Sequence, residues 1–449
     1  MILLLSCYEL GHQPLGLAWP LAFLERAGLA ARAVDLATEP FPEALAREAR
    51  FVALATPMHT ALRLGVKAAR RVRAANPSAH LAFHGHYAGL NAEYLLDSGL
   101  ADSVLAGESE AALAELAAAV LGGRAAGGRS VPMRVRLDYP VPRRDVLPPL
   151  RRYARFESAS GSALAGYVEA SRGCKHLCAH CPIVPIYRGR FFAVPVETVM
   201  QDVRQQVAAG ARHISFGDPD FLNGPAHARR VARALHAEFP ELSFDFTAKV
   251  EHLLRERALL PELREQGCAF VVSAVESLSD EVLRRLRKGH TAADVAALVE
   301  VLDGVGLPLH PTLVAFTPWT TLEDYLEALE FFRARGLASH VPPIQLAIRL
   351  LVPPGSALLE DPESAACFGP LDPESLLHSW CHPDPRMDAL HAEVQALVAR
   401  DEAARTPGRA SWEAIGALAQ AAAGRATRDE PMPPPFRPEP PRLSEHWFC

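Results

Sequence analysis

Three cysteines stand close together in the middle of the chain. Cys174, Cys178 and Cys181 lie in the run SRGCKHLCAHCP, with three residues between the first two and two between the last two. Eight cysteines in 449 residues, without an apolar run that resembles an export signal, are too few for a disulfide framework, so grouped thiols indicate a metal site. A structural zinc would take a fourth ligand, which His176 or His180 could supply, whereas an iron–sulfur cluster is built on thiolates. The spacing alone leaves both open.

The cysteine run follows the first of six apolar segments that alternate with helical patterns. This alternation predicts six βα units and therefore a partial or full barrel, whose active site lies at the carboxyl ends of its strands. The cysteines come directly after the first strand and should lie at that edge. The expected strands are residues 166–170, 212–216, 243–247, 269–274, 308–315 and 344–351.

The first part of the chain shows a separate strand–helix alternation, which predicts a doubly wound parallel sheet of flavodoxin or Rossmann type. The fold class is therefore α/β: this sheet, then a barrel, then a helical region with a proline-rich end. The expected division is residues 1–125 for the doubly wound domain, 126–165 for a Gly- and Pro-containing linker, 166–365 for the barrel, 366–427 for the helical region and 428–449 for an extended tail.

Composition restricts the partners. The net charge is -6, and a basic surface is what phosphate contacts need, so a nucleic-acid partner is not expected. No apolar run is long enough for a membrane span. The expected location is cytoplasmic.

The C-x3-C-x2-C spacing after the first strand of a βα barrel resembles the signature of radical S-adenosylmethionine (radical SAM) enzymes. The resemblance implies that Cys174, Cys178 and Cys181 hold a [4Fe–4S] cluster, and that S-adenosylmethionine chelates the fourth iron and is cleaved reductively to a 5′-deoxyadenosyl radical. It also implies an electron donor such as flavodoxin or ferredoxin. One departure is His180, where the family commonly has an aromatic residue.

Further strand ends match the same family. Gly217 and Asp218 stand where its short Gly–acidic motif meets the amino group of S-adenosylmethionine. The resemblance also assigns cofactor contacts to residues after the third and fourth expected strands and to one within the sixth. These are Lys249, Glu276, Ser277 and Arg349, the last of which would pair with the methionyl carboxylate. An ordinary surface ion pair is the alternative for each charged residue.

The first domain is similar to the cobalamin-binding module that precedes many radical SAM barrels. It lacks the Asp-x-His-x-x-Gly motif whose histidine ligates cobalt from below in many members. Cobalamin binding and a lid without cobalamin therefore both remain open.

The whole chain is similar to an uncharacterised subgroup whose members end in Cys-Cys-Ala-Glu-Pro or Cys-selenocysteine-Ala-Glu-Pro. This sequence stops at Cys449, the first residue of that tail. The hypothesis is that an in-frame UGA codon was read as a stop; the alternative is a natural end with one exposed thiol.

These observations predict a radical SAM enzyme that acts on an unidentified small molecule, by hydrogen abstraction or by cobalamin-mediated methyl transfer. A soft atom such as sulfur, selenium or arsenic would suit a substrate that meets a thiol-ended arm. The alternative is a non-catalytic zinc or metal sensor. A methylthiotransferase acting on RNA is disfavoured by the net charge and by the lack of a recognisable carboxyl-terminal β-barrel for RNA binding.

Overall fold

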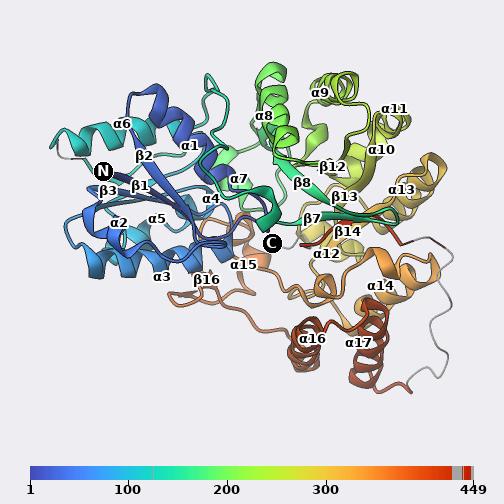
Figure 1. Ribbon diagram of the computed structural model, residues 1–449. Helices are drawn as coiled ribbons and strands as arrows, with labels where there is room; N and C mark the ends of the chain where they lie inside the picture. The colour runs from blue at the N-terminus through green and yellow to red at the C-terminus, as the bar shows by residue number, and fades with distance from the viewer. Residues whose placement is uncertain (125, 427–436, 438, 446–449) are drawn as a thin grey trace.

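The computed structural model describes residues 1–124, 126–426, 437 and 439–445. Figure 1 shows two sheets side by side, an N-terminal one (blue) and a central one (green to yellow), with the last helices below the central sheet. The part of the chain that is described contains no helix long and apolar enough to cross a membrane.

The N-terminal sheet consists of parallel strands in the order β2-β1-β3-β4-β5-β6. Its strands are β1 (Ile2–Ser6), β2 (Ala31–Asp35), β3 (Phe51–Ala55), β4 (His80–His84), β5 (Ser103–Leu105) and β6 (Gly128–Arg129). Every residue of β1 and β3 is buried, as expected for central strands with helices on both faces. Helices α1 (Leu15–Arg26) and α6 (Glu110–Leu121) cover one face, and α2 (Glu43–Glu48) and α3 (His59–Ala75) cover the other (Figure 1). The predicted doubly wound domain is confirmed.

The central sheet has the order β14-β13-β12-β11-β8-β7-β17. Five of its strands are parallel: β8 (Gly161–Val168), β11 (His213–Phe216), β12 (Ser243–Ala248), β13 (Cys268–Glu276) and β14 (Leu309–Leu313). The main helices after these strands are α9 (Pro225–Glu238), α10 (Val250–Arg255), α11 (Leu260–Glu265) and α13 (Ala292–Val305), and α8 (Val196–Ala208) precedes β11. The sheet does not close, because β14 ends one side and β17 the other. This open sheet is the predicted partial barrel.

The predicted sixth strand, residues 344–351, is wrong. The structure has a 3-10 helix, η5 (Pro343–Ala347), followed by a single bridge between Phe316 and Arg349. Pro342 and Pro343 remove two backbone donors at the start of the segment, which prevents a ladder there. The apolar run is buried all the same, since η5 packs against α16 (Pro385–Ala404). A short apolar run in a sequence predicts that a segment is buried more reliably than it predicts that the segment is a strand.

The segment expected to be a linker takes part in both sheets. It supplies β6 to the N-terminal sheet and the antiparallel strand β7 (Arg155–Ser158) to the central one. At its middle, Arg144 donates to both oxygens of Asp202 on α8, at 2.9 and 2.8 Å, and to the carbonyl of Tyr167 at 2.7 Å. It also reaches the carbonyl of Gln13 at 3.3 Å. One buried guanidinium thus connects the linker, the N-terminal domain and the barrel.

The helical region contains α16 and α17 (Gly408–Ala422), which pack together, as expected from its pattern. Beyond them, β17 (Arg442–Leu443) pairs antiparallel with β7. The chain then reaches the N-terminal domain, where the Tyr8 hydroxyl donates to Glu445. Cys449 and most of the proline-rich stretch lie outside the described residues.

Removing the buried guanidinium should destabilise the protein strongly. We expect Arg144→Ala to lower the free energy of unfolding by about 3–5 kcal/mol, because Asp202 would remain buried without its partner. Urea unfolding followed by circular dichroism measures the change. The matched control is Arg143→Ala, whose carboxylate partners Asp145 and Glu25 are largely exposed, so its cost should stay below about 1 kcal/mol. Equal costs for the two variants would contradict this role of Arg144.

Candidate functional site

The cysteine loop begins where β9 (Ser171–Gly173) ends, and β9 pairs antiparallel with β10 (Phe191–Ala193). Gly173 has a φ of 75° and lies against the Arg190 carbonyl and the Tyr187 ring, so a side chain has no room there. This glycine turns the chain directly into Cys174. After the third cysteine the chain enters the short helix α7 (Ile183–Tyr187).

Residues far along the chain hold the loop in place. The Asn223 side chain accepts from the Lys175 amide at 3.0 Å and donates to the Gly173 carbonyl at 3.4 Å. At the other end of the loop, the Ala179 amide donates to the Leu286 carbonyl at 2.9 Å. None of the seven described cysteines is in a disulfide. The loop is therefore fixed by hydrogen bonds to the neighbouring βα units.

The three thiols come from one short loop and form an all-sulfur set of potential ligands. Iron–sulfur clusters are held by such thiolates, whereas a structural zinc takes four closed ligands. The donor set therefore suits iron–sulfur chemistry.

Lys288 provides positive charge beside the thiols. It is buried, and its Nζ donates to Glu276 Oε1 at 3.1 Å. Burial lowers the pKa of Lys288, but attraction to Glu276, Cys178 and Cys181 outweighs burial and raises it above its ordinary value. For Glu276, burial raises the pKa, and Lys288 and His180 bring it down to about 2. Lys288 and Glu276 are therefore both charged next to the loop.

Glu276, expected from the family resemblance to contact the cofactor, lies beside the loop. It ends β13 in the left-handed region, with a φ of 64°, at a bulge opposite β14. His180 Nε2 lies 3.4 Å from its Oε1, while His180 Nδ1 is buried and has no hydrogen-bond partner among the described residues. The neighbouring Ser277 uses its hydroxyl to accept from the Ser279 amide at 3.1 Å.

Gly217 and Asp218 lie beside the residues that precede the cysteines. Asp218 accepts from the Ala170 amide at 2.8 Å and from the Ser171 hydroxyl at 2.5 Å. Burial raises the pKa of Asp218 to about 7, against the lowering effect of these hydrogen bonds. At Gly217 a Cβ atom would overlap the Tyr167 ring, so glycine is required there. Gly217 and Asp218 are therefore fixed in position. The two groups that donate to the Asp218 carboxyl, an amide and a hydroxyl, are both uncharged.

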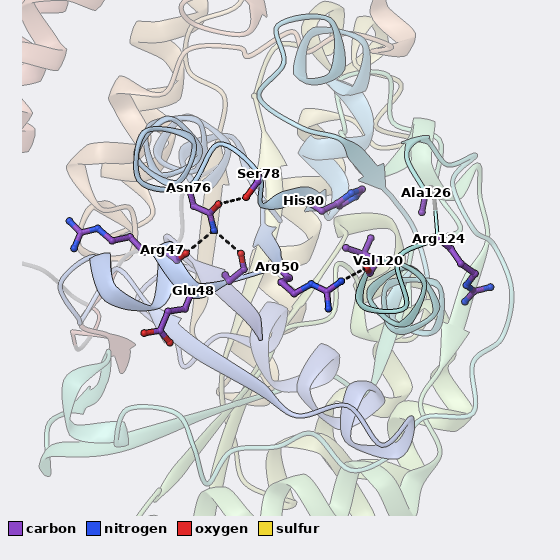
Figure 2. A pocket seen from close by; sticks show the side chains of 11 residues that line it. Arg47, Glu48, Arg50, Asn76, Ser78, His80, Val120, Arg124 and Ala126 are labelled. Carbon is purple, nitrogen blue, oxygen red and sulfur yellow. Dashed lines mark hydrogen bonds between the residues drawn. The ribbon is translucent and has the colours of Figure 1, made fainter.

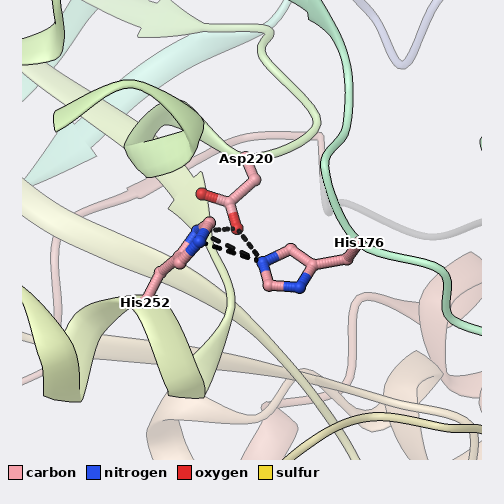
Figure 3. Close-up of side chains that lie close together, drawn as sticks. All are labelled: His176, Asp220 and His252. Atoms are coloured by element: carbon pink, nitrogen blue, oxygen red, sulfur yellow. Dashed lines mark hydrogen bonds and ion pairs between the residues drawn. The ribbon is translucent and has the colours of Figure 1, made fainter. Parts of the chain in front are cut away.

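Lys249 lies within a hydrogen-bonded group on the other side of the loop. Its Nζ is 3.1 Å from His176 Nδ1 and 3.4 Å from Glu251 Oε2. Figure 3 shows His176 from the cysteine loop, Asp220 from the loop after β11 and His252 from α10 pointing toward one another. Burial and the nearby Lys249 lower the pKa of His176 to about 3, so this ring is neutral.

The structure gives Arg349 partners within the protein. Its Nη1 donates to Asp388 Oδ1 at 2.7 Å, its Nη2 donates to the Trp380 carbonyl at 2.8 Å, and the guanidinium stacks 3.5 Å from the Trp380 ring. These contacts tie the end of the barrel to α16. Since the predicted strand around Arg349 is absent, this residue does not stand at a strand end as expected.

Sequence reasoning missed several residues that support the loop: Arg172, Asp220, Asn223, His252 and Lys288. Arg172 lies in the cysteine run itself, and the others lie in segments within about a dozen residues of Asp218, Lys249 or Glu276, three residues that the sequence did single out. Only the folded chain shows which member of each segment faces the cysteines. The signal available was the position of these segments after β11, β12 and β13.

A pocket in the N-terminal domain lies away from this site. Figure 2 shows Arg47, Arg50, Asn76 and His80 around it, at the amino ends of β3 and β4. The Asn76 amide donates to the carbonyls of residues 46, 47 and 49, so it ties the end of α3 to the carboxyl end of α2. In open parallel sheets ligands bind beyond the carboxyl ends of strands, which lie at the opposite edge from this pocket.

Comparisons with known proteins agree with the geometry. Residues 168–332 match the family described as the Radical SAM superfamily. The ribosomal protein uS12 methylthiotransferase RimO of Porphyromonas gingivalis is 30% identical over 181 residues, which are 37% of this chain and 40% of that protein. The tRNA-2-methylthio-N(6)-dimethylallyladenosine synthase of Fusobacterium nucleatum is 28% identical over 203 residues, 41% of this chain and 43% of that protein. The chain thus spans about two fifths of the length of these relatives.

Two solved structures extend the likeness to the N-terminal sheet. OxsB, a cobalamin-dependent S-adenosylmethionine radical enzyme with aqua-cobalamin bound, has a TM-score of 0.69 at 13% identity and covers 89% of this chain and 67% of its own. TsrM, a radical S-adenosylmethionine methyltransferase from Kitasatospora setae, has a TM-score of 0.57 at 16% identity, with coverages of 74% and 70%. Residues 168–332 are a radical SAM domain. The N-terminal sheet and this domain together have the fold seen in cobalamin-dependent radical SAM enzymes.

The buried carboxyl of Asp218 should make stability depend on pH. The folded protein holds its proton up to about pH 7 and the unfolded chain only to about 3.8, so the wild type should lose stability as pH rises through this window. Three pKa units correspond to up to about 4 kcal/mol. Asp218→Asn should remove this loss. Urea unfolding of both proteins at several pH values between 4 and 8 measures it, and parallel curves for the two would contradict the shift.

Proposed function

We propose that this protein is a radical SAM enzyme whose [4Fe–4S] cluster is held by Cys174, Cys178 and Cys181. The observation that carries the proposal is the placement of the three thiols at the carboxyl edge of a parallel half-barrel, with Lys288 close to two of them. The donor set fits the cluster, since one loop supplies three thiols that become thiolate ligands when iron binds. When bound, the cluster supplies the electron for reductive cleavage of S-adenosylmethionine. An electron donor such as flavodoxin or ferredoxin would deliver it.

The chain's own residues provide a polar rim for S-adenosylmethionine. We assign the orientation of its ammonium group to Asp218 and the Gly217 backbone, because the Asp218 carboxylate is buried without a cation facing it in the described structure. Lys249, Glu276 and Ser277 lie after the next strands and supply further polar contacts. Arg349 is not assigned to the methionyl carboxylate, since Asp388 and Trp380 already engage it.

We further propose a small-molecule substrate and methyl transfer supported by cobalamin. The names of the relatives concern a ribosomal protein and a tRNA, but those matches cover only about two fifths of each relative. The net charge of -6 opposes binding to a nucleic acid. The N-terminal sheet supports cobalamin, because OxsB has the same overall fold and was solved with aqua-cobalamin.

A histidine near the carboxyl ends of the N-terminal strands would be able to contact the cobalt of cobalamin through a ring nitrogen. His84 ends β4, and its Nε2 is buried without a hydrogen-bond partner in the described part of the chain. His59 Nε2 instead lies 2.7 Å from the Ser375 carbonyl. We therefore assign the contact with cobalt to His84 Nε2, a buried ring nitrogen without a partner in the described part of the chain.

The alternative of a non-catalytic zinc protein is not supported. Residues 168–332 match the Radical SAM superfamily, whose cysteine spacing this chain has. The two proposals also differ in the metal that they require, which makes the following test decisive.

Removing one thiol should abolish the cluster without unfolding the chain. We expect anaerobically reconstituted wild type to carry about four irons and four sulfides per chain and to cleave S-adenosylmethionine when reduced. Cys178→Ala should lose both properties. Iron and sulfide analysis, the absorbance of the cluster and chromatography of the cleavage products measure this.

The matched control for this test is Cys268→Ala. Cys268 is a buried thiol at the start of β13, where it packs in the core away from the loop, so its variant should keep the cluster. Circular dichroism checks that both variants are folded. Stoichiometric zinc with no cleavage in the wild type would overturn the proposed function.

Cobalamin should bind independently of the thiols. After incubation with hydroxocobalamin and desalting, we expect the wild type and Cys178→Ala to retain about one cobalamin per chain, since the two sites belong to different sheets. Ultraviolet–visible spectra measure the retained cobalamin. For the reduced cobalt(II) form, nitrogen splitting in the electron paramagnetic resonance spectrum that disappears in His84→Ala would identify the axial ligand. No retained cobalamin would contradict this part of the proposal.

A further inference from the structure

Two histidines and an aspartate form a compact group beside the cysteine loop. His252 Nδ1 lies 2.7 Å from Asp220 Oδ2, His176 Nε2 lies 3.7 Å from the same oxygen, and His176 Nε2 lies 3.4 Å from His252 Nδ1. The residues come from three separate segments, so local chain geometry does not explain their meeting. Asp220 is completely buried and His252 almost so, while His176 keeps 14% of its side chain exposed. The group is therefore largely closed to bulk water, and His176 is its most exposed member. Figure 3 shows the three side chains pointing toward one another.

These separations suit three ligands of one ion. Bonds of about 2.1 Å from an ion to nitrogen or oxygen place neighbouring ligand atoms about 3.0 Å apart in octahedral geometry and about 3.4 Å apart in tetrahedral geometry. The three separations are 2.7, 3.4 and 3.7 Å, so they lie within a few tenths of an ångström of these values, and His252 Nδ1 and Asp220 Oδ2, now at hydrogen-bond distance, would move apart slightly to share an ion. Two imidazoles and one carboxylate are a common donor set for zinc and for non-haem iron(II), and they leave positions for water or substrate.

The surroundings provide the outer contacts that such sites need. Asp220 is oriented by the Leu222 amide on Oδ1 at 2.9 Å and by the Lys249 amide on Oδ2 at 3.2 Å. In this structure His176 Nδ1 lies 3.1 Å from the Lys249 ammonium, which donates to it, and 3.6 Å from Glu251 Oε2. For His176 to ligate through Nε2, its Nδ1 must carry the proton and donate to Glu251 in place of accepting from Lys249. The Lys249 ammonium, 3.4 Å from the same oxygen, would then pair with Glu251. The charges around the group are mixed, because Arg255 also lies 3.8 Å from Glu251.

We propose that His176, Asp220 and His252 form a second metal site, which binds one divalent ion of the zinc, iron(II) or manganese(II) class through nitrogen and oxygen ligands. This site is distinct from the three thiols and does not depend on the proposed function, because it contains no sulfur ligand. Its place at the carboxyl edge of the half-barrel, next to the cysteine loop, puts its open positions on the side where a substrate would enter.

The test uses Co²⁺ as the probe on the full chain with Cys174, Cys178 and Cys181 all changed to alanine, which removes the thiols. We expect one Co²⁺ per chain and a visible d–d absorption band of nitrogen and oxygen coordination. Added to this background, His252→Gln and Asp220→Asn should weaken Co²⁺ binding by more than about tenfold. His176→Ala is the variant least liable to disturb the fold, because its side chain is the most exposed of the three, and it should weaken binding as well.

His227→Gln is the matched control in the same background. This histidine lies on α9 of the same domain and bonds to the Ala170 carbonyl at 3.1 Å, so Co²⁺ binding should be unchanged. Circular dichroism establishes that each variant is folded. If the folded thiol-free chain binds no Co²⁺, or if the three ligand variants bind it as tightly as their background, the proposal is overturned and the group is only a hydrogen-bonded anchor for the loop. Iron and sulfide analysis of the wild type tests the cluster separately, so failure of one proposal does not imply failure of the other.

Discussion

A buried guanidinium sets the relative position of the two sheets and the start of the cysteine loop. Arg172 lies on β9, two residues before Cys174, and contacts Glu110 at 2.5 Å, Glu108 at 3.5 Å and Glu169 at 3.0 Å. Two of these carboxylates belong to the N-terminal domain and one to the barrel. A buried charge is tolerated only when its partners are in place. The same ion pairs of Arg172 therefore hold the two domains together and fix the strand that leads into Cys174.

Charges around the loop favour a bound cation over free thiolates. Burial, with help from Asp220, raises the pKa of Cys174 to about 11, so this thiol stays protonated unless a cation lies against it. Lys288 offers positive charge near Cys178 and Cys181, but Glu276 already shares it. Three thiolates in this loop therefore require more positive charge than the protein supplies. Metal ions are the natural source, and they couple the folding of the loop to their own binding.

The sequence revealed the elements that carry the site better than it revealed how the site is supported. The cysteine spacing and the apolar strands predicted the loop at the carboxyl edge of a half-barrel, because local patterns determine both. The contacts of Lys288, Asn223 and Arg172 join residues separated by about 10 to 60 positions, and no local pattern specifies such pairs. The partners of Arg349 were missed for the same reason, because they also lie far away in the sequence. Its segment is apolar because it is buried beneath α16, and its charge is matched by Asp388, which belongs to that helix.

The radical SAM match covers residues 168–332, and much of the chain lies outside it. The loop supports Asn223, Glu276 and Lys288 all fall within residues 168–332, so they belong to the machinery of the domain itself. Outside it are the N-terminal strand ends, the helices after residue 332, and β17, which runs parallel to β8 toward the carboxyl edge before Glu445 meets Tyr8. Glu445 brings β17 to the N-terminal domain, whereas α16 and α17 pack against each other and against η5. Because one shared domain hosts many activities, we expect substrate choice in this protein to depend on segments outside residues 168–332.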